Sequence, residues 1–503
     1  MAKANAKPVN KKRALLMLAI AAVIVILSRI LPLPEGLSRS GLTALAIMIA
    51  ALVLWVSEAM NMAVTTILLC CMLPFLGVMI AALVLWITEA MNMAVTTILL
   101  VCMLPFFGVM KPAEMFKGFG GSVFFFMIGT MSITTALAST TIPTRMAGAI
   151  LSWSKNNPVK LVLGFTVGTA VLSSIMSNIP TCALFASLGI AIMKANGDPK
   201  PGTSNLGRCL MIGIPAGSVI GGFMTPAGGP TNIVAINALE AVGIRVTFLD
   251  WMIMGYPIGL ICAVLFALWI CLFYKPEKIS DEALGIAHDM VSGSGPLTSR
   301  EIKCMIVIIL MFVTWIASTW IPIFNTTVVA LFGTCLFMCP GIEVITWQDY
   351  VEKGGWDGTF LVGGVGAMAE AALSTGAASW IISSTLGGAA GWSPVVVCLA
   401  VSALICVLHW LCPSGPAVAG LAVAPIIILA QTAGASPVAL AIITAFWSGV
   451  TFLLPTDAVP MFTYGFHYYS ITDMVKEGWV PSLVFIVFVA FAIPFMTGIL
   501  GYA

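Results

Sequence analysis

Residues 177–181 read SNIPT and residues 225–232 read TPAGGPTN, two polar interruptions inside otherwise apolar sequence. Proline removes a backbone donor and glycine leaves a helix easily, so both interruptions predict places where a helix breaks. Unpaired backbone is tolerated within a membrane only where it is buried in protein or lines a wet cavity. Many transporters hold ions and anions at such breaks, surrounded by hydroxyls and amides. The two interruptions therefore predict half of a binding site.

A second, less faithful pair of interruptions follows at residues 412–416 (CPSGP) and 454–460 (LPTDAVP). Matched interruptions in the two halves of a chain are the best sequence pointer to a transporter site. Proline and glycine also merely kink transmembrane helices, where both are common. One break alone fits either interpretation, but two matched pairs favour a binding site.

Composition predicts an all-α polytopic membrane protein. Of the 503 residues, 60% are hydrophobic and 8% are charged, and apolar stretches of about 20 residues recur along the chain. A net charge of +2 without a basic stripe gives no reason to expect a nucleic-acid partner. The thirteen cysteines are scattered through apolar runs, and His288, His409 and His467 form no spaced ligand set. We therefore expect no cofactor and no metal beyond a coupling ion.

The N-terminal tail, residues 1–13, is polar and basic and is expected on the cytoplasmic side. The apolar run 14–33 lacks an obvious small-residue cleavage site, which favours a retained first helix over a signal peptide. These features predict an integral protein of a bacterial cytoplasmic membrane, in contact with membrane lipid.

A tandem copy follows. Residues 49–79 recur almost verbatim at residues 80–110, with differences only at positions 56/87, 57/88, 70/101 and 76/107. A single direct copy is not a solenoid, which needs at least three repeats. The 31-residue copy is either a recent duplication or an error in the underlying gene sequence. In the protein it forms either membrane crossings or a packed surface hairpin.

The remaining apolar runs predict helices, hairpins and loops. Arms of about 15 residues on either side of the first break are short for a full crossing, which predicts a re-entrant hairpin at 161–193. A second hairpin is expected at 393–433, broken helices at 209–241 and 437–466, a basic loop at 145–160, and the last helix at 480–501. The expected parts of the chain are the tail 1–13, a first scaffold part 14–141 with both copies, a first transport half 160–274, a polar linker 275–302, a second scaffold part 303–385 and a second transport half 393–501.

Four stretches of the chain resemble the divalent anion/sodium symporter family, which carries di- and tricarboxylates and sulfate. They are LWVSEA at 54–59, Ser177-Asn178, the break at 225–232, and residues 454–465 together with 471–474. The resemblance runs from residue 14 to residue 501, apart from the extra copy. It implies eleven transmembrane helices plus two re-entrant hairpins in an inverted repeat. It also implies a homodimer in which an elevator-like transport half moves against a scaffold.

The resemblance implies site residues as well. In this family the hairpin tips and helix breaks clasp two sodium ions and face the carboxylates of the substrate. A first cation site would then consist of Ser177, Asn178, Gly228, Gly229 and Asn232. The anion-binding candidates are Asn178, Thr181, Thr231, Ser414 and Thr456. Neutral donors and helix N-termini suit a dicarboxylate, because desolvated fixed charge is costly.

The chain departs from the family pattern at three places. Ile179 stands where the first threonine is expected, and Pro413-Ser414-Gly415 replaces the second Ser-Asn-Thr. Asp457 stands at the second break, where a neutral residue is expected. An acid within the membrane is expensive unless it is used. Asp457 is therefore a cation-binding candidate that either replaces lost sodium ligands or takes a proton.

Other polar residues in apolar sequence have a structural and a functional interpretation. Glu58 and Glu89 fit interfacial or structural roles, and Glu370 fits a buried structural partner or a proton relay. His409 precedes the second hairpin tip and either packs there or touches substrate. His467, Tyr468 and Tyr469 are expected to form an interface belt.

We expect a secondary active transporter of small organic anions, above all di- or tricarboxylates, with sodium coupling. Sodium-independent exchange, proton coupling and transport of an inorganic anion such as sulfate stay open as alternatives. A passive channel is the alternative from another class, and matched broken helices argue against an open pore. The sequence has no nucleophile–base set or metal cluster that would indicate an enzyme.

Overall fold

The computed structural model of the chain describes residues 93–106, 109–197, 202–280, 282, 285, 295–321, 323–374, 391–411, 415–455 and 457–502. All regular secondary structure in these residues is helical, as the composition predicts. Several predictions lie outside the described residues, namely those for the tail 1–13, the run 14–33, the copy 49–79, residues 80–92 and 107–108 of the second copy, Glu58, Glu89, Ser414 and Thr456.

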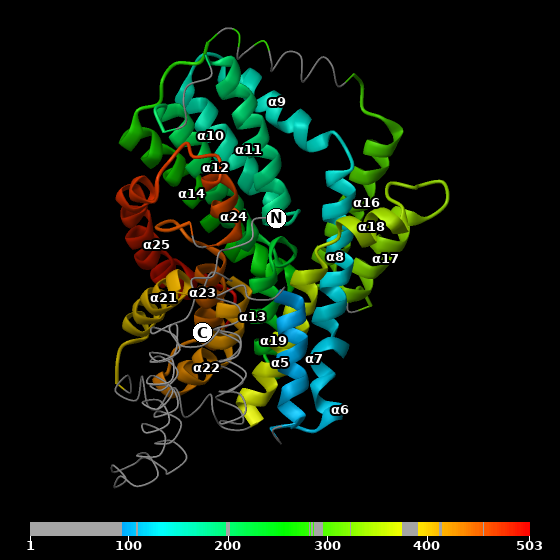
Figure 1. Cartoon of the computed structure of the whole chain (residues 1–503). Helices are drawn as coiled ribbons and strands as arrows, with labels where there is room; N and C mark the ends of the chain where they lie inside the picture. The colour runs from blue at the N-terminus through cyan, green and yellow to red at the C-terminus, as the bar shows by residue number, and fades with distance from the viewer. Residues whose placement is uncertain are drawn as a thin grey trace, which may run out of the picture.

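The first described helices span residues 93–154 (Figure 1). They are α5 (Met93–Phe106), α6 (Pro112–Met115), α7 (Lys117–Gly120), α8 (Ser122–Ala138) and α9 (Ile142–Ser154). The prediction of a loop at 145–160 is wrong, because α9 fills most of it. Pro143 lies in the first turn of α9, where its missing donor costs nothing. Pro143, Ala147 and Leu151 recur at helical spacing and are buried, so the helix packs along one side.

The first transport half follows as a helix pair, a broken helix and a long helix. The pair is α10 (Pro158–Ser173) and α11 (Asn178–Ala195). The broken helix consists of α12 (Asn205–Met224), a short 3-10 turn η1 (Pro226–Gly228) and α13 (Pro230–Ala241). The long helix is α14 (Phe248–Tyr274). The predicted break at 225–232 therefore lies where the helix ends.

The second half repeats this order after four helices that lie in the described residues between α14 and α21. Those four are α16 (Ser299–Ala317), α17 (Thr326–Met338), α18 (Trp347–Lys353) and α19 (Trp356–Ser374). A helix pair, a broken helix and a long helix then follow as α21 (Pro394–Leu411), α22 (Gly415–Ala433), α23 (Pro437–Gly449), α24 (Ala458–Tyr464) and α25 (Ile471–Ile499). The re-entrant course of the two helix pairs stays a prediction.

Two element boundaries in the second half differ from the prediction. The break in the second broken helix begins at Val450 instead of residue 455. The last helix begins at Ile471 instead of residue 480. The Ser470 hydroxyl accepts from the Asp473 backbone N–H, and the Asp473 carboxylate accepts from the Ser470 N–H. This reciprocal cap starts the helix early.

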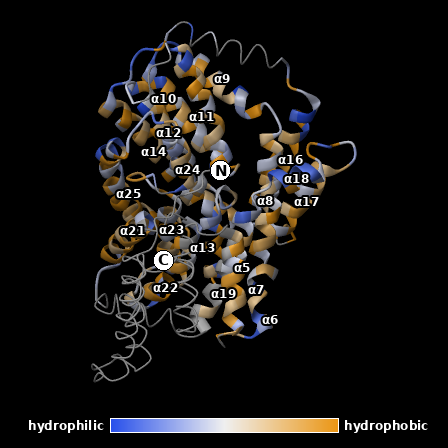
Figure 2. Cartoon of the chain, viewed as in Figure 1, coloured by the Kyte–Doolittle hydropathy of each residue, from blue (hydrophilic) through white to orange (hydrophobic). Residues whose placement is uncertain are grey.

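Five described helical segments are long and apolar enough to cross a membrane, namely 112–138, 178–195, 205–224, 248–274 and 471–499. Helix α12 is buried over almost its whole length. Helices α14 and α25 instead expose large apolar side chains such as Leu265 and Phe495. Figure 2 shows hydrophobic residues along the helices and hydrophilic residues gathered near α18 and the loop ends. This distribution suits a helix bundle surrounded by lipid.

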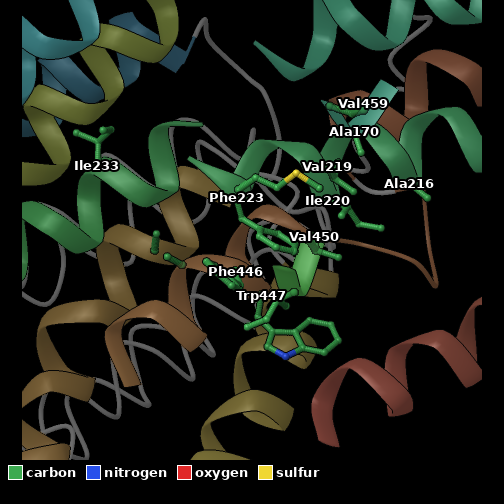
Figure 3. Packing of buried hydrophobic residues seen from close by; sticks show 14 of the residues in the cluster. Ala170, Ala216, Val219, Ile220, Phe223, Ile233, Phe446, Trp447, Val450 and Val459 are labelled. Carbon is green, nitrogen blue, oxygen red and sulfur yellow. The ribbon is translucent and has the colours of Figure 1, made fainter. Parts of the chain in front are cut away.

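The two halves pack across each other at their breaks. Helix α13, which follows the first break, packs against α22 and α23 of the second half. Helix α24, which follows the second break, packs against α11 and α12 of the first half. The rings of Phe223 and Phe446 stack with centroids 4.2 Å apart and join α12 to α23 (Figure 3). Each break therefore lies beside elements of the opposite half.

Close contact between α10 and α12 depends on glycine. A Cβ atom on Gly217 would lie 2.2 Å from the carbonyl oxygen of Thr166. A Cβ atom on Gly221 would lie 2.1 Å from the carbonyl oxygen of Ala170. Small residues let membrane helices approach this closely. The pair of glycines thus holds the broken helix against the first arm of the helix pair.

Gly221→Ala is expected to lower the stability of the purified protein, because the new methyl group would overlap the Ala170 carbonyl. Overpacking of this kind typically costs about 1–3 kcal/mol. The measurement is the midpoint of thermal unfolding in detergent. Gly498→Ala on α25 is the matched control, since nothing lies within 4 Å of its added methyl. A midpoint for Gly221→Ala as high as that of the control would contradict the close packing.

Candidate functional site

The first break is closed by Asn232, a buried residue in the first turn of α13. Its side-chain Nδ2 donates to the Gly222 carbonyl oxygen at 2.7 Å and to the Thr225 carbonyl oxygen at 2.8 Å. The Gly222 carbonyl lies in the last turn of α12, where carbonyls lack an intrahelical partner, whereas the Thr225 carbonyl also accepts from the Gly228 N–H at 3.1 Å. The Thr225 hydroxyl donates to the Ser174 carbonyl oxygen at 2.6 Å, which ties the break to the first helix pair.

Asn178 lies on the opposite side of the same glycine. A Cβ atom on Gly222 would come within 2.5 Å of the Asn178 side-chain amide. The Asn178 Oδ1 accepts from the Ser173 hydroxyl at 2.8 Å, and its backbone carbonyl accepts from the Ser218 hydroxyl at 2.7 Å. Two predicted site residues, Asn178 and Asn232, thus meet around Gly222.

Gly228 and Gly229 complete this cluster. Cβ atoms there would lie 2.6 Å and 3.2 Å from the Gly222 carbonyl oxygen. The structure therefore brings together four of the five residues predicted for the first cation site. They surround the break with neutral amides, hydroxyls and carbonyl oxygens. Unwound backbone of this kind supplies the oxygen ligands that transporters use for sodium.

The other two predicted residues of the first tip are placed differently. Ser177 is exposed, and its backbone N–H donates to the Thr134 hydroxyl of α8 at 3.0 Å. Thr181 is fully buried, and its hydroxyl donates to the Ser177 carbonyl oxygen at 2.9 Å. The Thr181 hydroxyl is thus engaged within its own helix turn, away from the Gly222 cluster.

Thr231 joins the first break to the second half. A Cβ atom on Gly449, the last residue of α23, would lie 3.3 Å from the Thr231 hydroxyl oxygen. A Cβ atom on Gly415, the first residue of α22, would lie 3.4 Å from the Thr231 methyl carbon. This predicted anion-binding residue is therefore buried beside both the second tip and the second break.

The second break is organised by Asp457 and His409. Asp457 caps α24, and its Oδ1 accepts from the Val459 N–H at 3.1 Å. Its Oδ2 lies 3.5 Å from the Nε2 of His409, a fully buried residue near the end of α21. The other ring nitrogen, Nδ1, lies 3.0 Å from the carbonyl oxygens of Trp447 and Val450. Figure 3 shows Trp447 and Val450 within the packed core.

The contact of His409 explains why the break begins early. The Val450 carbonyl bonds to the imidazole ring, and the Trp447 carbonyl accepts both from the ring and from the Val450 N–H that ends the helix. His409 therefore has a structural position at the break, one of the two roles expected from its sequence. The side chain of Glu370 lies outside the described residues.

The predicted interface belt is wrong for two of its three residues. Tyr468 and Tyr469 are buried, and only His467 is exposed. The Tyr469 hydroxyl donates to the Pro460 carbonyl oxygen at 2.8 Å, just after the second break. The Tyr468 ring packs on Gly207, whose Cβ atom would lie 2.5 Å from it. A buried tyrosine that finds a backbone acceptor looks the same in sequence as one at a membrane interface.

Three further polar side chains of the structure were not among the predicted site residues. Ser173 and Ser218 support Asn178, and their signal in the sequence is a hydroxyl within an apolar helix. Glu477 in α25 is fully buried, and its carboxylate oxygens have no hydrogen-bond partner in the part of the chain that the structure describes. It was overlooked because the last helix was expected to begin after it.

The chain is similar in sequence to known transporters. The family model described as citrate transporter matches residues 83–446. The sodium-dependent dicarboxylate transporter SdcS of Staphylococcus saprophyticus is 25% identical over 505 residues, which cover 95% of this chain and 90% of that protein. SdcS of Staphylococcus aureus strain USA300 is 24% identical over 496 residues, which cover 93% and 88% of the two chains.

Two further matches are transporters by name. An uncharacterized transporter of Haemophilus influenzae is 26% identical over 387 residues, which cover 74% of this chain and 80% of that protein. Among solved structures, the YdaH transporter of Alcanivorax borkumensis aligns with a TM-score of 0.48 and 12% identity, over 76% of this chain and 86% of that one. Since the citrate transporter model covers most of the sequence, the chain belongs to the citrate transporter family and is an integral membrane transporter of the divalent anion/sodium symporter type, not an enzyme.

Proposed function

We propose that the chain is a secondary active transporter of small organic anions, di- or tricarboxylates above all, and that sodium drives it. The observation that carries this proposal is the Gly222 cluster, where Asn178, Gly228, Gly229 and Asn232 gather at a helix break. The names of the relatives support the substrate class, since both SdcS proteins are sodium-dependent dicarboxylate transporters.

The chemistry of the first break suits a sodium ion beside a carboxylate. No Lys or Arg occurs in residues 173–193 or 209–241, which contain the first tip and the first break. Helices α11 and α13 both begin at this cluster, and helix N-termini favour anions without a fixed cation. Asn178, Thr231, Ser414 and Thr456 are the residues that we propose for anion binding. Thr181 is a weaker candidate because its hydroxyl bonds within its own turn.

The mechanism that we propose is an elevator movement of both breaks against a scaffold. The repeated element order and the packing of each break on the opposite half support a single moving body. An inverted repeat, a homodimer, a bacterial cytoplasmic membrane and a cytoplasmic N-terminus remain parts of this proposal. Cross-linking in native membranes tests the dimer, and accessibility labelling of the tail tests the orientation.

A second candidate is a sodium-independent exchanger or a proton-coupled carrier. The replacement of the second Ser-Asn-Thr by Pro413-Ser414-Gly415 and the contact of Asp457 with His409 favour it. An inorganic anion such as sulfate is the alternative substrate. Uptake measurements separate these possibilities.

Radiolabelled succinate and citrate uptake into proteoliposomes is expected to require an inward sodium gradient. The reason is that the first break offers oxygen ligands for a cation next to the anion. Choline in place of sodium is the control, and unlabelled anion inside the vesicles detects exchange. Uptake that is independent of sodium but requires unlabelled anion inside the vesicles would contradict sodium symport and indicate anion exchange.

Asn232→Ala is expected to weaken sodium binding, because it removes the amide that holds the Gly222 and Thr225 carbonyls. In the wild type, sodium at one hundred times its dissociation constant is expected to add about 2.7 kcal/mol of stability. The measurement is the sodium-induced rise in the unfolding midpoint of each variant over its own sodium-free value. Asn237→Ala, on the same helix, is the matched control and should keep the full rise. A full rise in Asn232→Ala would remove Asn232 from the cation site.

A further inference from the structure

The second break contains an imidazole ring surrounded by oxygen atoms. Two carbonyl oxygens, those of Trp447 and Val450, lie 3.0 Å from Nδ1 of His409. A carboxylate oxygen of Asp457 lies 3.5 Å from Nε2. Carbonyl oxygens only accept, so Nδ1 must carry a hydrogen and act as the donor. That assignment leaves Nε2 as the nitrogen that faces the acid.

The state of Nε2 depends on one proton. Without it, Nε2 is an acceptor 3.5 Å from a carboxylate oxygen of Asp457, and neither atom has a hydrogen to offer the other. With it, both ring nitrogens carry a hydrogen, and a positive imidazolium lies beside a carboxylate. Nε2 is buried and has no hydrogen-bond partner among the described residues. The geometry therefore provides a place for one proton between His409 and Asp457.

The neighbouring helices offer few competing groups. Helices α22 and α23, which pack against α21, contain no acidic or basic residue. The titratable residues of the other adjoining elements are Cys398 and Cys406 on α21 itself, Tyr464 on α24, Asp473, Lys476 and Glu477 on α25, Cys182 and Lys194 on α11, and Arg208 and Cys209 on α12. None of them makes a hydrogen bond or ion pair with His409 or Asp457 in the described part of the chain.

The pair of His409 and Asp457 also connects three helices of the second half, α21, α23 and α24. His409 lies two residues before the end of α21, directly ahead of the second tip. The carbonyls that it contacts belong to the end of α23, and Asp457 caps α24. A positive ring at the C-terminal end of α23 is favoured by the helix dipole. Gain of a proton would strengthen the contacts of His409 with Asp457 and with the end of α23. Loss of the proton would release Asp457 and the second hairpin tip from these contacts.

We propose that His409 and Asp457 bind a proton that is carried together with the anion. The inference rests on the proposed carboxylate transport and specifies its coupling. The proton enters from water on one side of the membrane, binds Nε2, and leaves to water on the other side. No bond other than the N–H bond forms or breaks.

The test is succinate accumulation by the full-length chain in proteoliposomes. Sodium is equal on both sides, and potassium with valinomycin holds the membrane potential at zero. With the inside one pH unit above the outside, the accumulation ratio at equilibrium is expected to rise about tenfold for one coupled proton. Sodium-driven uptake is measured in the same preparation at equal pH, so that carboxylate transport itself is recorded separately.

His409→Gln and Asp457→Asn are both expected to lose the response to the pH gradient. Succinate can itself carry a proton, so a response that persists in both variants would assign the proton to the substrate and overturn the inference. Asp457→Asn keeps the test valid if His409→Gln fails to fold, because asparagine caps a helix as well as aspartate does. Counterflow at equal pH reports that each variant still binds succinate.

His467→Asn is the matched control. His467 is exposed, has a φ of 61°, and is a position that asparagine tolerates. This variant should keep the pH response. Wild-type uptake that is driven by sodium but ignores the pH gradient would overturn the inference and leave the proposed function intact. Absence of succinate and citrate uptake under either gradient would overturn both.

Discussion

A helix that ends inside apolar surroundings leaves backbone groups without partners, and no water is present to satisfy them. Both halves of this chain depend on how that problem is solved. At the first break neutral side chains satisfy these groups: the Asn232 amide donates to two carbonyls and the Thr225 hydroxyl donates to a third. At the second break ionisable side chains do so: His409 donates to two carbonyls and Asp457 accepts from an N–H.

This difference between the halves matters more than their common element order. The first break keeps a cluster of neutral oxygen and nitrogen atoms around Gly222, which suits a hard cation and an anion held without fixed charge. The second half has lost the amide and hydroxyl of the family pattern at its tip, residues 413–415, and has an acid at its break with an imidazole beside it. The departures in sequence and the contact in space thus fall in the same half. Thr231 connects the two, because it belongs to the first half and lies against the second.

The positions of the breaks could be predicted from sequence, because proline and glycine act locally on the backbone. Their edges could not. The second break begins at Val450 because a side chain from another helix takes its carbonyl, and no local signal encodes that. The partnership of His409 with Asp457 likewise depends on the packing of α21 against α23. Thr181 was a reasonable anion ligand by spacing, but its hydroxyl bonds to the turn below it. Glu477 was missed because a capping box lengthens the last helix beyond its apolar run.

The way in which each break is satisfied bears on how the chain is made. Helix α13 gains its covering from α22 and α23, which leave the ribosome much later. Yet the hydrogen bonds of Asn232, Thr225 and Ser218 that close the first break are all made within the first half. The same is true of the second half, where His409 and Asp457 serve their own break. Each half thus carries the groups that satisfy its own broken backbone, and the two halves then join through apolar contacts such as Phe223 with Phe446 and through polar contacts such as Arg208 with Asp473.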